Sequence, residues 1–341
     1  MYIIRNSEYK DKDSIIRFID TYWKKDHALV KSSSLFNFQH LESDGTLSFI
    51  VAVNNETNDI DGLFGYISIS HFDSLIKDNG LFWGAIWKIR TDITNTELNR
   101  IGLKMLYKIM NLPNFKTYAA IGISSIAKDI YTLLKFNMGH LNHYYILNEN
   151  ISNFNIAQNV EPKQVREHTF RDYFVRTIDI TDYENSTLTS DYYPCKTINY
   201  LINRYKNHPI YEYDFLGLFI ENELSTIFVL RKIFIGSSSI IRIIDVYGKI
   251  HQVPDLYNDF QNILDNSKSE YIDLLNYGLD IDYVNNIGFE LLDFESNIII
   301  PTYFEPFLRE NVKIEFAYKG VDDYLIFKGD SDQDRPNVIY L

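Results

Sequence analysis

Apolar residues follow two different patterns along the first half of the chain. Short runs rich in β-branched and aromatic residues predict strands, and runs with apolar residues three or four positions apart predict helices. The predicted strands span residues 2–5, 47–53, 60–69, 81–90, 117–123 and 143–147. The predicted helices span residues 14–23, 97–110 and 125–136. Antiparallel strands followed by a strand–helix–strand–helix–strand run predict an α+β sheet that contains a crossover.

The second half of the chain repeats this rhythm without obvious sequence identity. Its predicted strands span residues 213–220, 225–234, 240–247 and 271–276, and its predicted helices span residues 253–264 and 280–287. We therefore expect an internal structural duplication. The polar stretch from residue 148 to 171 is the best candidate boundary. It divides the chain into domains at 1–150 and 172–341, with 151–171 as the connecting segment.

The composition and charge of the chain exclude several classes of protein. The 341 residues are 45% hydrophobic and 15% aromatic, which excludes wholesale disorder. The formal net charge of −13 argues against a nucleic-acid polymer as partner, although a few local donors can still hold a small phosphorylated ligand. The chain has one cysteine, Cys195, no signal-peptide pattern at its start and no apolar run of the ~20 residues that cross a bilayer. We expect a soluble cytoplasmic protein that does not act at a membrane.

Four segments between residues 80 and 147 resemble the GNAT superfamily of acyl-CoA-dependent N-acyltransferases. They read WKIR at 87–90, RIGLKML at 100–106, IGI at 121–123 and AKDIYTLLKF at 127–136. The second copy, together with residues 140–147 and 328–337, is similar to the tandem-GNAT enzymes that acylate dTDP-linked 3-amino-3,6-dideoxyhexoses for surface polysaccharides such as O-antigen. This resemblance implies two GNAT-like domains in tandem, each a mixed, mostly antiparallel sheet flanked by helices.

The resemblance also implies acyl-CoA as co-substrate, bound in the first domain. Free backbone groups of a splayed strand would hold the pantetheine, and the turn that feeds the next helix would hold the diphosphate. Only Gly102 fits the family's glycine-rich turn; Arg100 stands where a glycine is usual, and Glu97 stands where a basic residue is usual. The alternative role for Gly102 is close helix packing. The candidate CoA-binding residues are Trp87, Lys88, Ile89, Arg90, Arg100, Ile101, Gly102, Leu103, Lys104, Ser124 and Ala127.

Tyr131 is the candidate proton donor to the departing thiolate, because the family places a tyrosine at this point of the helix. The alternative is a core aromatic residue at helical spacing. A general base would take a proton from the acceptor ammonium, and His143 is the main candidate, with His27 and His40 as others or a water in its place. The pair His140 and His143 lacks a third ligand in register, so we expect no metal.

The acceptor would contact both halves. Trp23, His27 and His40 belong to a segment that forms either a lid over the acyl or sugar group or ordinary packing. The degenerate second domain would contact the nucleotide-linked amino sugar through polar residues near the ends of two predicted central strands, namely Arg242, Asp245, Tyr247, Asp273, Asn276 and Tyr277. The resemblance further suggests that the acidic tail at 330–337 is ordered, with Arg335 paired internally.

Three functions remain open at this point. The first is an N-acyltransferase that moves an acetyl or a short hydroxyacyl group, such as 3-hydroxybutanoyl, from acyl-CoA to the sugar amine. The second is a catalytically inactive GNAT-like binding module, which the incomplete glycine turn favours. The third is an aminoacyl or peptidyl transferase with a tRNA-linked donor, against which the net negative charge argues.

Overall fold

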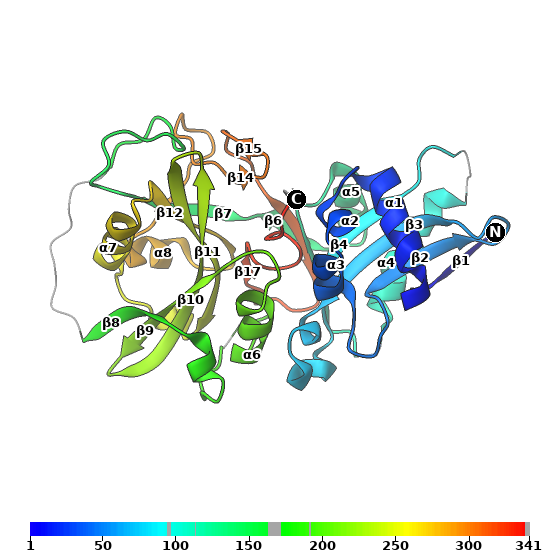
Figure 1. The fold of residues 1–341 in the computed structure, drawn as a ribbon, viewed down its shortest axis with the longest axis horizontal. Helices are drawn as coiled ribbons and strands as arrows, with labels where there is room; N and C mark the ends of the chain where they lie inside the picture. The colour runs from blue at the N-terminus through cyan, green and yellow to red at the C-terminus, as the bar shows by residue number, and fades with distance from the viewer. Residues whose placement is uncertain (94–96, 113, 163–171, 191, 338–341) are drawn as a thin grey trace.

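Two mixed β-sheets, each flanked by helices, form the two lobes of the computed structural model (Figure 1). The structure describes residues 1–341 except 94–96, 113, 163–171, 191 and 338–341. The described α-helices are α1 (Lys12–Phe18), α2 (Ala28–Lys31), α3 (Ser33–His40), α4 (Leu98–Met110), α5 (Ser125–Leu133), α6 (Ile198–Leu201), α7 (Tyr257–Ser267) and α8 (Ile281–Ile287). The predicted α+β class is confirmed.

The first sheet has seven strands, in the order β1 (Tyr2–Asn6), β2 (Phe49–Asn54), β3 (Ile60–Ser68), β4 (Leu81–Ile89), β5 (Thr117–Ile121), β16 (Glu315–Lys319) and β6 (Asn137–His140). Neighbouring residues of β2 enter different cores, because side chains alternate across a strand. Ile50 packs with α4 and α5 on one face, whereas Val51 packs with α1, α2 and α3 on the other. Both faces are therefore covered by helices.

The second sheet follows the order β13 (Glu290–Leu291), β7 (Asn142–Leu147), β12 (Tyr271–Tyr277), β11 (Ser238–Gly248), β10 (Glu223–Ile235), β9 (Asp214–Ile220) and β8 (Tyr173–Ile178). The short strand β17 (Ile326–Phe327) pairs antiparallel with β12. Helices α7 and α8 pack on one face of this sheet. A separate hairpin joins β14 (Tyr303–Phe304) to β15 (Phe307–Leu308).

Each half of the chain contributes one strand to the sheet of the other half. Strand β7 lies between β12 and β13, and β16 lies between β5 and β6. The expected boundaries at 1–150 and 172–341 therefore divide the chain but not the sheets. Part of the expected connecting segment, residues 163–171, lies outside the described residues.

The two sheets also share an irregularity. Between β3 and β4 the pairing shifts after Phe64, and between β10 and β11 it shifts after Val229. In both cases the extra residue lies on the strand that also forms a parallel pair, β4 with β5 or β11 with β12. It comes directly after the last residue of that parallel pairing. This common position supports the expected duplication.

The predicted helices differ from the observed ones mainly at their ends. The helix predicted at 14–23 is α1 followed by a π-helical turn, Ile19–Trp23. Helix α5 ends at Leu133, because Lys135 adopts a positive φ of 56°. That backbone conformation favours glycine and ends a helix, although the residue here is a lysine. The helix predicted at 253–264 begins later, at Tyr257.

Candidate active site

Strands β4 and β5 separate in the middle of the first sheet, and we call the opening between them the first fork. The two strands pair in parallel only from Leu81 to Gly84 on β4 and from Thr117 to Ala120 on β5. Beyond Gly84, β4 continues to Ile89 with β3 as its only strand neighbour in the described part of the sheet. The backbone groups on that edge are therefore free of strand pairing. An extended ligand with amide groups can hydrogen-bond to such an edge.

A pair of tyrosines lies at the start of the first fork. The Tyr118 and Tyr131 hydroxyl oxygens are 2.8 Å apart, and both side chains are 1% exposed. Burial raises the pKa of both phenols well above the usual value. Each phenol therefore stays protonated at neutral pH, so that Tyr131 can act as a hydrogen-bond or proton donor but not as a base.

Gly84 makes room for this pair. A Cβ on Gly84 would lie 2.0 Å from Tyr118 Oη, so that the hydroxyl would have to move and its bond to Tyr131 would break. We expect Gly84→Ala to lower the free energy of unfolding by about 1–3 kcal/mol, measured by urea denaturation. Gly102→Ala is the matched control, because its Cβ would lie 3.3 Å from Trp87 Nε1, in a helix that favours alanine. Equal losses in the two variants would contradict the crowding at Gly84.

The expected role of Gly102 in a phosphate-binding turn is not what the structure shows. Gly102 is the fifth residue of α4, which begins at Leu98, so that it lies inside the helix rather than in the turn before it. Its Cα faces the Trp87 ring, which also lies 4.9 Å from Phe64 and 5.8 Å from Tyr131 between ring centres. Gly102 therefore allows close packing of α4 against β4, the alternative role considered above. Residues 94–96, which precede α4 in the sequence, lie outside the described residues.

The other candidate CoA-binding residues take varied positions. Trp87, Lys88 and Ile89 lie on the free edge of β4, and Ser124 caps α5 by accepting the Ala127 N–H at 3.3 Å. Arg100 and Lys104 are exposed on α4, while Ile101 is buried under it and Leu103 is half-buried. Arg100 and Lys104 are thus the two cations among the candidates that are exposed to solvent.

Arg90 is committed to its own ion pairs. Its guanidinium contacts the Asp61 and Asp92 carboxylates, both at 2.9 Å, and lies 4.5 Å from the centre of the Tyr22 ring. The hydrogen bonds to these two acids raise the pKa of Arg90 above its usual value. Its backbone N–H is engaged as well, since it donates to the Asp61 carbonyl at 2.9 Å.

The second sheet has a matching fork, and the chain itself fills it. Strands β11 and β12 pair in parallel only from Ile241 to Ile243 on β11. Beyond that point β17 pairs with β12, and the Gly329 N–H donates to the Ile244 carbonyl at 2.8 Å. Asn276 donates from its side chain to the Ile326 carbonyl at 2.9 Å. The second fork therefore has no room for an extended ligand of the kind that the first can accept.

A fully buried charge cluster closes the second fork. Lys196 Nζ lies 2.7 Å from the Asp245 carboxylate and 2.8 Å from the Asp330 carboxylate, and all three side chains are inaccessible. Tyr205 also donates to Asp245, at 2.8 Å. Burial raises the pKa of Asp330 to about 6. Lys196 thus links two acids, Asp245 from β11 and Asp330 from the tail.

The tail that follows β17 reaches the mouth of the first fork. The Ser331 hydroxyl donates to the Gly84 carbonyl at 2.6 Å, and the Gln333 amide donates to the Ile121 carbonyl at 3.0 Å. Arg335 pairs with Asp332 at 3.0 Å. Arg335 is thus paired within the tail, and the same segment contacts both forks.

The histidines do not gather around Tyr131. His143 lies on β7 in the second sheet, where its Nε2 is 3.0 Å from Asp273 and its Nδ1 has no partner within the described residues. Burial lowers its pKa. His27 caps α2, and His40 bonds to Ser48 Oγ at 2.8 Å. Burial lowers the pKa of both to about 3, which leaves them poor proton acceptors at neutral pH.

Trp23 ends the π-helical turn and is 40% exposed, whereas His27 and His40 are buried. His27 and His40 are packing residues under the surface. Of the three residues expected in a lid, Trp23 alone is exposed. The remaining acceptor candidates, in the second half, are largely used within the protein. Tyr247 donates to the Leu188 carbonyl at 2.6 Å, and Tyr277 packs against Phe316.

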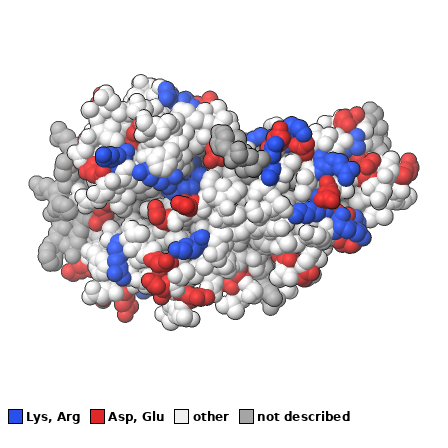
Figure 2. All heavy atoms as spheres, in the orientation of Figure 1, with Lys and Arg blue, Asp and Glu red and all other residues white. Residues whose placement is uncertain are grey.

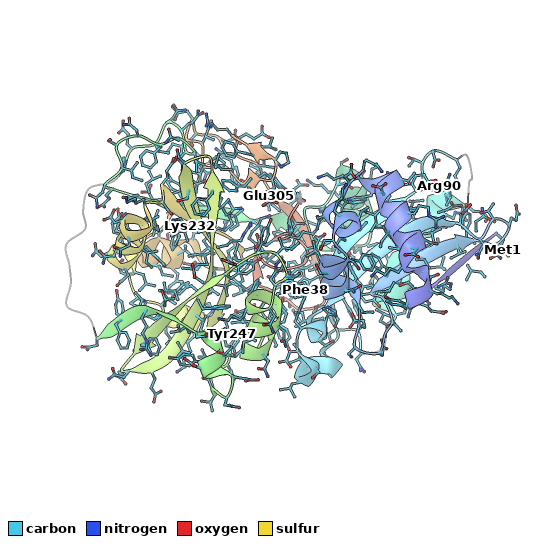
Figure 3. All side chains as sticks on the ribbon, in the orientation of Figure 1. Met1, Phe38, Arg90, Lys232, Tyr247 and Glu305 are labelled. Atoms are coloured by element: carbon cyan, nitrogen blue, oxygen red, sulfur yellow. The ribbon has the colours of Figure 1, made fainter. Side chains whose placement is uncertain are left out.

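Among the acceptor candidates of the second half, Arg242 lines a cavity whose lining residues all come from that half of the chain. The cavity has a volume of about 110 Å³ and is bounded by β10, β11, the β14–β15 hairpin and the tail. Glu305, on the turn of that hairpin, lies near the middle of the molecule in Figure 3, as does Phe38 of α3. Arg242 pairs with Asp273, with the closest contact at 2.5 Å. We call this space the central cavity.

Sequence reasoning missed the other charged residues of the central cavity. They come from β10, the hairpin and the tail and comprise Arg231, Glu305, Lys328, Asp332, Asp334 and Arg335. They are far apart in the sequence, and only the resemblance directed attention to the tail. Among the described residues, no group of three or more His, Cys, Asp or Glu side chains could hold a metal ion. No helix in the described part of the chain is long and apolar enough to cross a membrane.

The fold is shared with solved acyltransferase structures. A GCN5-related N-acetyltransferase from Anabaena variabilis ATCC 29413 matches with a TM-score of 0.55 and 6% identity, over 94% of this chain and 73% of that one. A probable N-acyltransferase from Enterococcus faecalis V583 matches with a TM-score of 0.55 and 7% identity, over 86% and 70%. No family model and no curated protein matches the chain. The structural matches extend over both halves, and the chain therefore has the fold of tandem GCN5-related N-acetyltransferases.

Proposed function

We propose that the protein is an acyl-CoA-dependent N-acyltransferase whose first half holds the coenzyme. One observation carries this proposal. Of the two equivalent forks, the chain fills the second with β17, whereas no strand among the described residues pairs with the β4 edge of the first beyond Gly84. Pantetheine has two amides that suit such an edge. The shared fold supports the same reaction class.

In the proposed reaction, the neutral amine of the acceptor attacks the thioester carbonyl carbon. Backbone N–H groups of β4 stabilise the oxyanion, since donors at a strand bulge point away from the ladder. The C–N bond forms, the C–S bond breaks, and the thiolate takes the proton of Tyr131. Tyr118, bonded to Tyr131, can pass a proton back to it. Of the two protons lost by the acceptor ammonium, one returns through water to restore the tyrosine pair and the other leaves to solvent. Water carries them because burial lowers the pKa of His27, His40 and His143.

Tyr131 is 1% exposed, so that side chains lining the fork must move before a thioester reaches its hydroxyl. Its indole neighbour Trp87 is half-buried and is the side chain between Tyr131 and Gly102. If the fork does not open, the chain is an inactive binding module. This alternative is decided by the assay below.

We further propose a nucleotide-linked amino sugar, of the dTDP-3-amino-3,6-dideoxyhexose kind, as acceptor and an acetyl or short hydroxyacyl group as cargo. The basic residues of the central cavity support an acceptor with negative charge. A tRNA-linked donor is disfavoured, because acidic and basic side chains are interspersed over the face in Figure 2 and the net charge is −13. The lone Cys195 is consistent with a reducing compartment such as the cytoplasm.

The test is to incubate the protein with acetyl-CoA and longer acyl-CoAs and a panel of amino sugar nucleotides while free thiol is measured. The proposal expects thiol release that depends on both substrates, and an N-acylated sugar by mass spectrometry. CoA binding without thiol release for any acceptor would support the binding module instead. Absence of CoA binding would overturn the proposal.

A further inference from the structure

Lys328 lies on the wall of the central cavity without a partner for its charge. The residue is 4% exposed, and no hydrogen bond or ion pair reaches its Nζ within the described part of the chain. Its nearest aromatic contact is the Tyr303 ring, whose centre is 5.5 Å away. A buried lysine without a counter-ion is costly, because desolvation disfavours the ammonium. A protein that retains one beside a cavity has a place for an anion.

The other cations of the central cavity each have a carboxylate partner. Arg231 pairs with Asp334 at 2.7 Å, and Arg335 pairs with Asp332. Arg242 pairs with Asp273 behind the cavity wall, which leaves Lys328 as the cation without a carboxylate.

The third acid that lines the cavity, Glu305, is engaged elsewhere. Its carboxylate accepts hydrogen bonds from the Tyr211 hydroxyl at 2.7 Å and from the Asn337 N–H at 3.0 Å. Within the described residues, no carboxylate therefore lies within ion-pair distance of the Lys328 ammonium.

The surroundings of Lys328 lower its pKa. Burial and the nearby Arg242 and Arg231 lower its pKa to about 7, and Asp334 and Asp332 offset only part of that effect. The groups that line the cavity around it come from β10, β11, the hairpin, the loop before β9 and the tail, and the titratable and charged ones are Tyr211, Arg231, Arg242, Tyr303, Glu305, Asp332, Asp334 and Arg335. A bound anion would favour the ammonium and raise that pKa.

We propose that the central cavity is an anion subsite in which Lys328 binds a phosphate or carboxylate group of the acceptor substrate. The volume of about 110 Å³ admits one such group with a few waters. Gln333 links this subsite to the chemistry, because it lines the cavity and its amide donates to Ile121 at the mouth of the first fork. An acceptor anchored by its anion at Lys328 is thereby held next to the fork. The assignment to the acceptor rests on the proposed function, whereas anion binding itself does not.

The test follows the titration of Lys328 in the full-length protein without CoA. Lysines are labelled with ¹³C at Cε, and the Lys328 signal is identified by its loss in Lys328→Met. Titrations are recorded in chloride, in 50 mM inorganic phosphate and in 50 mM acetate at equal ionic strength. The proposal expects a midpoint near pH 7 in chloride and a rise of at least about half a pH unit with phosphate, acetate or both. The stronger of the two identifies the anion.

Lys313→Met is the matched control, because Lys313 is a half-exposed lysine whose ion pair with Glu295 lies at the surface. It should leave the Lys328 titration unchanged. If Lys328→Met fails to fold, Lys328→Gln provides the assignment. Midpoints that are the same in all three salts would overturn the proposal.

The kinetic arm separates this proposal from the proposed function. Lys328→Met should raise the KM for the acceptor at least tenfold while the KM for acyl-CoA stays the same. A midpoint that rises with phosphate in a protein that never releases CoA thiol would leave the anion subsite intact and reject the transferase. Full turnover together with a Lys328 midpoint that is the same in all three salts would support the transferase and reject the anion subsite.

Discussion

Lys196→Met is expected to lower the free energy of unfolding by about 3–5 kcal/mol. The substitution keeps the length of the side chain but leaves the buried carboxylates of Asp245 and Asp330 facing each other without a cation. A buried ion cluster contributes little net stability, but removal of one partner is costly. The reason is that an uncompensated charge remains in a medium of low polarity. Urea denaturation at pH 7, followed by fluorescence, measures the loss.

Lys206→Met is the matched control for this measurement. Lys206 also pairs with an aspartate, Asp179, at 3.1 Å, but both side chains are more than 40% exposed. Exposed pairs contribute about 0–1 kcal/mol, so that this variant should unfold close to the wild type. Equal effects of the two substitutions would mean that the second fork is not sealed by a buried charge cluster.

Tyr131→Phe is expected to lower kcat by about 10²–10⁴-fold while the KM for acyl-CoA changes little. The substitution removes only the hydroxyl that would protonate the thiolate and leaves the ring packed against Trp87 and Phe136. A loss confined to kcat indicates an interaction made in the transition state rather than in substrate binding. Thiol release at saturating acceptor, with titrated acyl-CoA, separates the two constants.

The hydroxyl of Tyr131 also bonds to Tyr118, so that the variant needs a stability control. Thermal unfolding of Tyr131→Phe should stay within a few degrees of the wild type, since one neutral hydrogen bond contributes about 1 kcal/mol. Tyr107→Phe, on the exposed side of α4, should retain full activity. A Tyr131→Phe enzyme with normal kcat would remove Tyr131 from the mechanism.

Local pattern was sufficient to predict most of the strands and helices. The β4 and β5 strands, α4 and α5 follow from apolar spacing, and the cap at Ser124 follows from its side-chain chemistry. Apolar spacing did not predict strands that form only because they pair with distant parts of the chain. Strand β16 is five residues long with charged ends, and it is a strand only because β5 and β6 offer two open edges.

The candidate site was predicted only in part. Tyr131 lies beside the first fork. Gly102 lies inside α4, as the apolar spacing at 97–110 predicts, whereas the resemblance had implied a phosphate-binding turn at this glycine. Lys328 could not be found, because its lack of a partner depends on residues from β10, β11 and the tail. The burial of the tail is a long-range effect of the same kind.

The central claim is that the first fork, and not the second, accepts acyl-CoA. A crystal structure of the full chain with CoA tests it most directly. The account predicts pantetheine along the β4 edge beyond Gly84, with its sulfur within hydrogen-bond reach of the Tyr131 hydroxyl, while β17 still pairs with β12. CoA bound between β11 and β12, with β17 displaced, would contradict it.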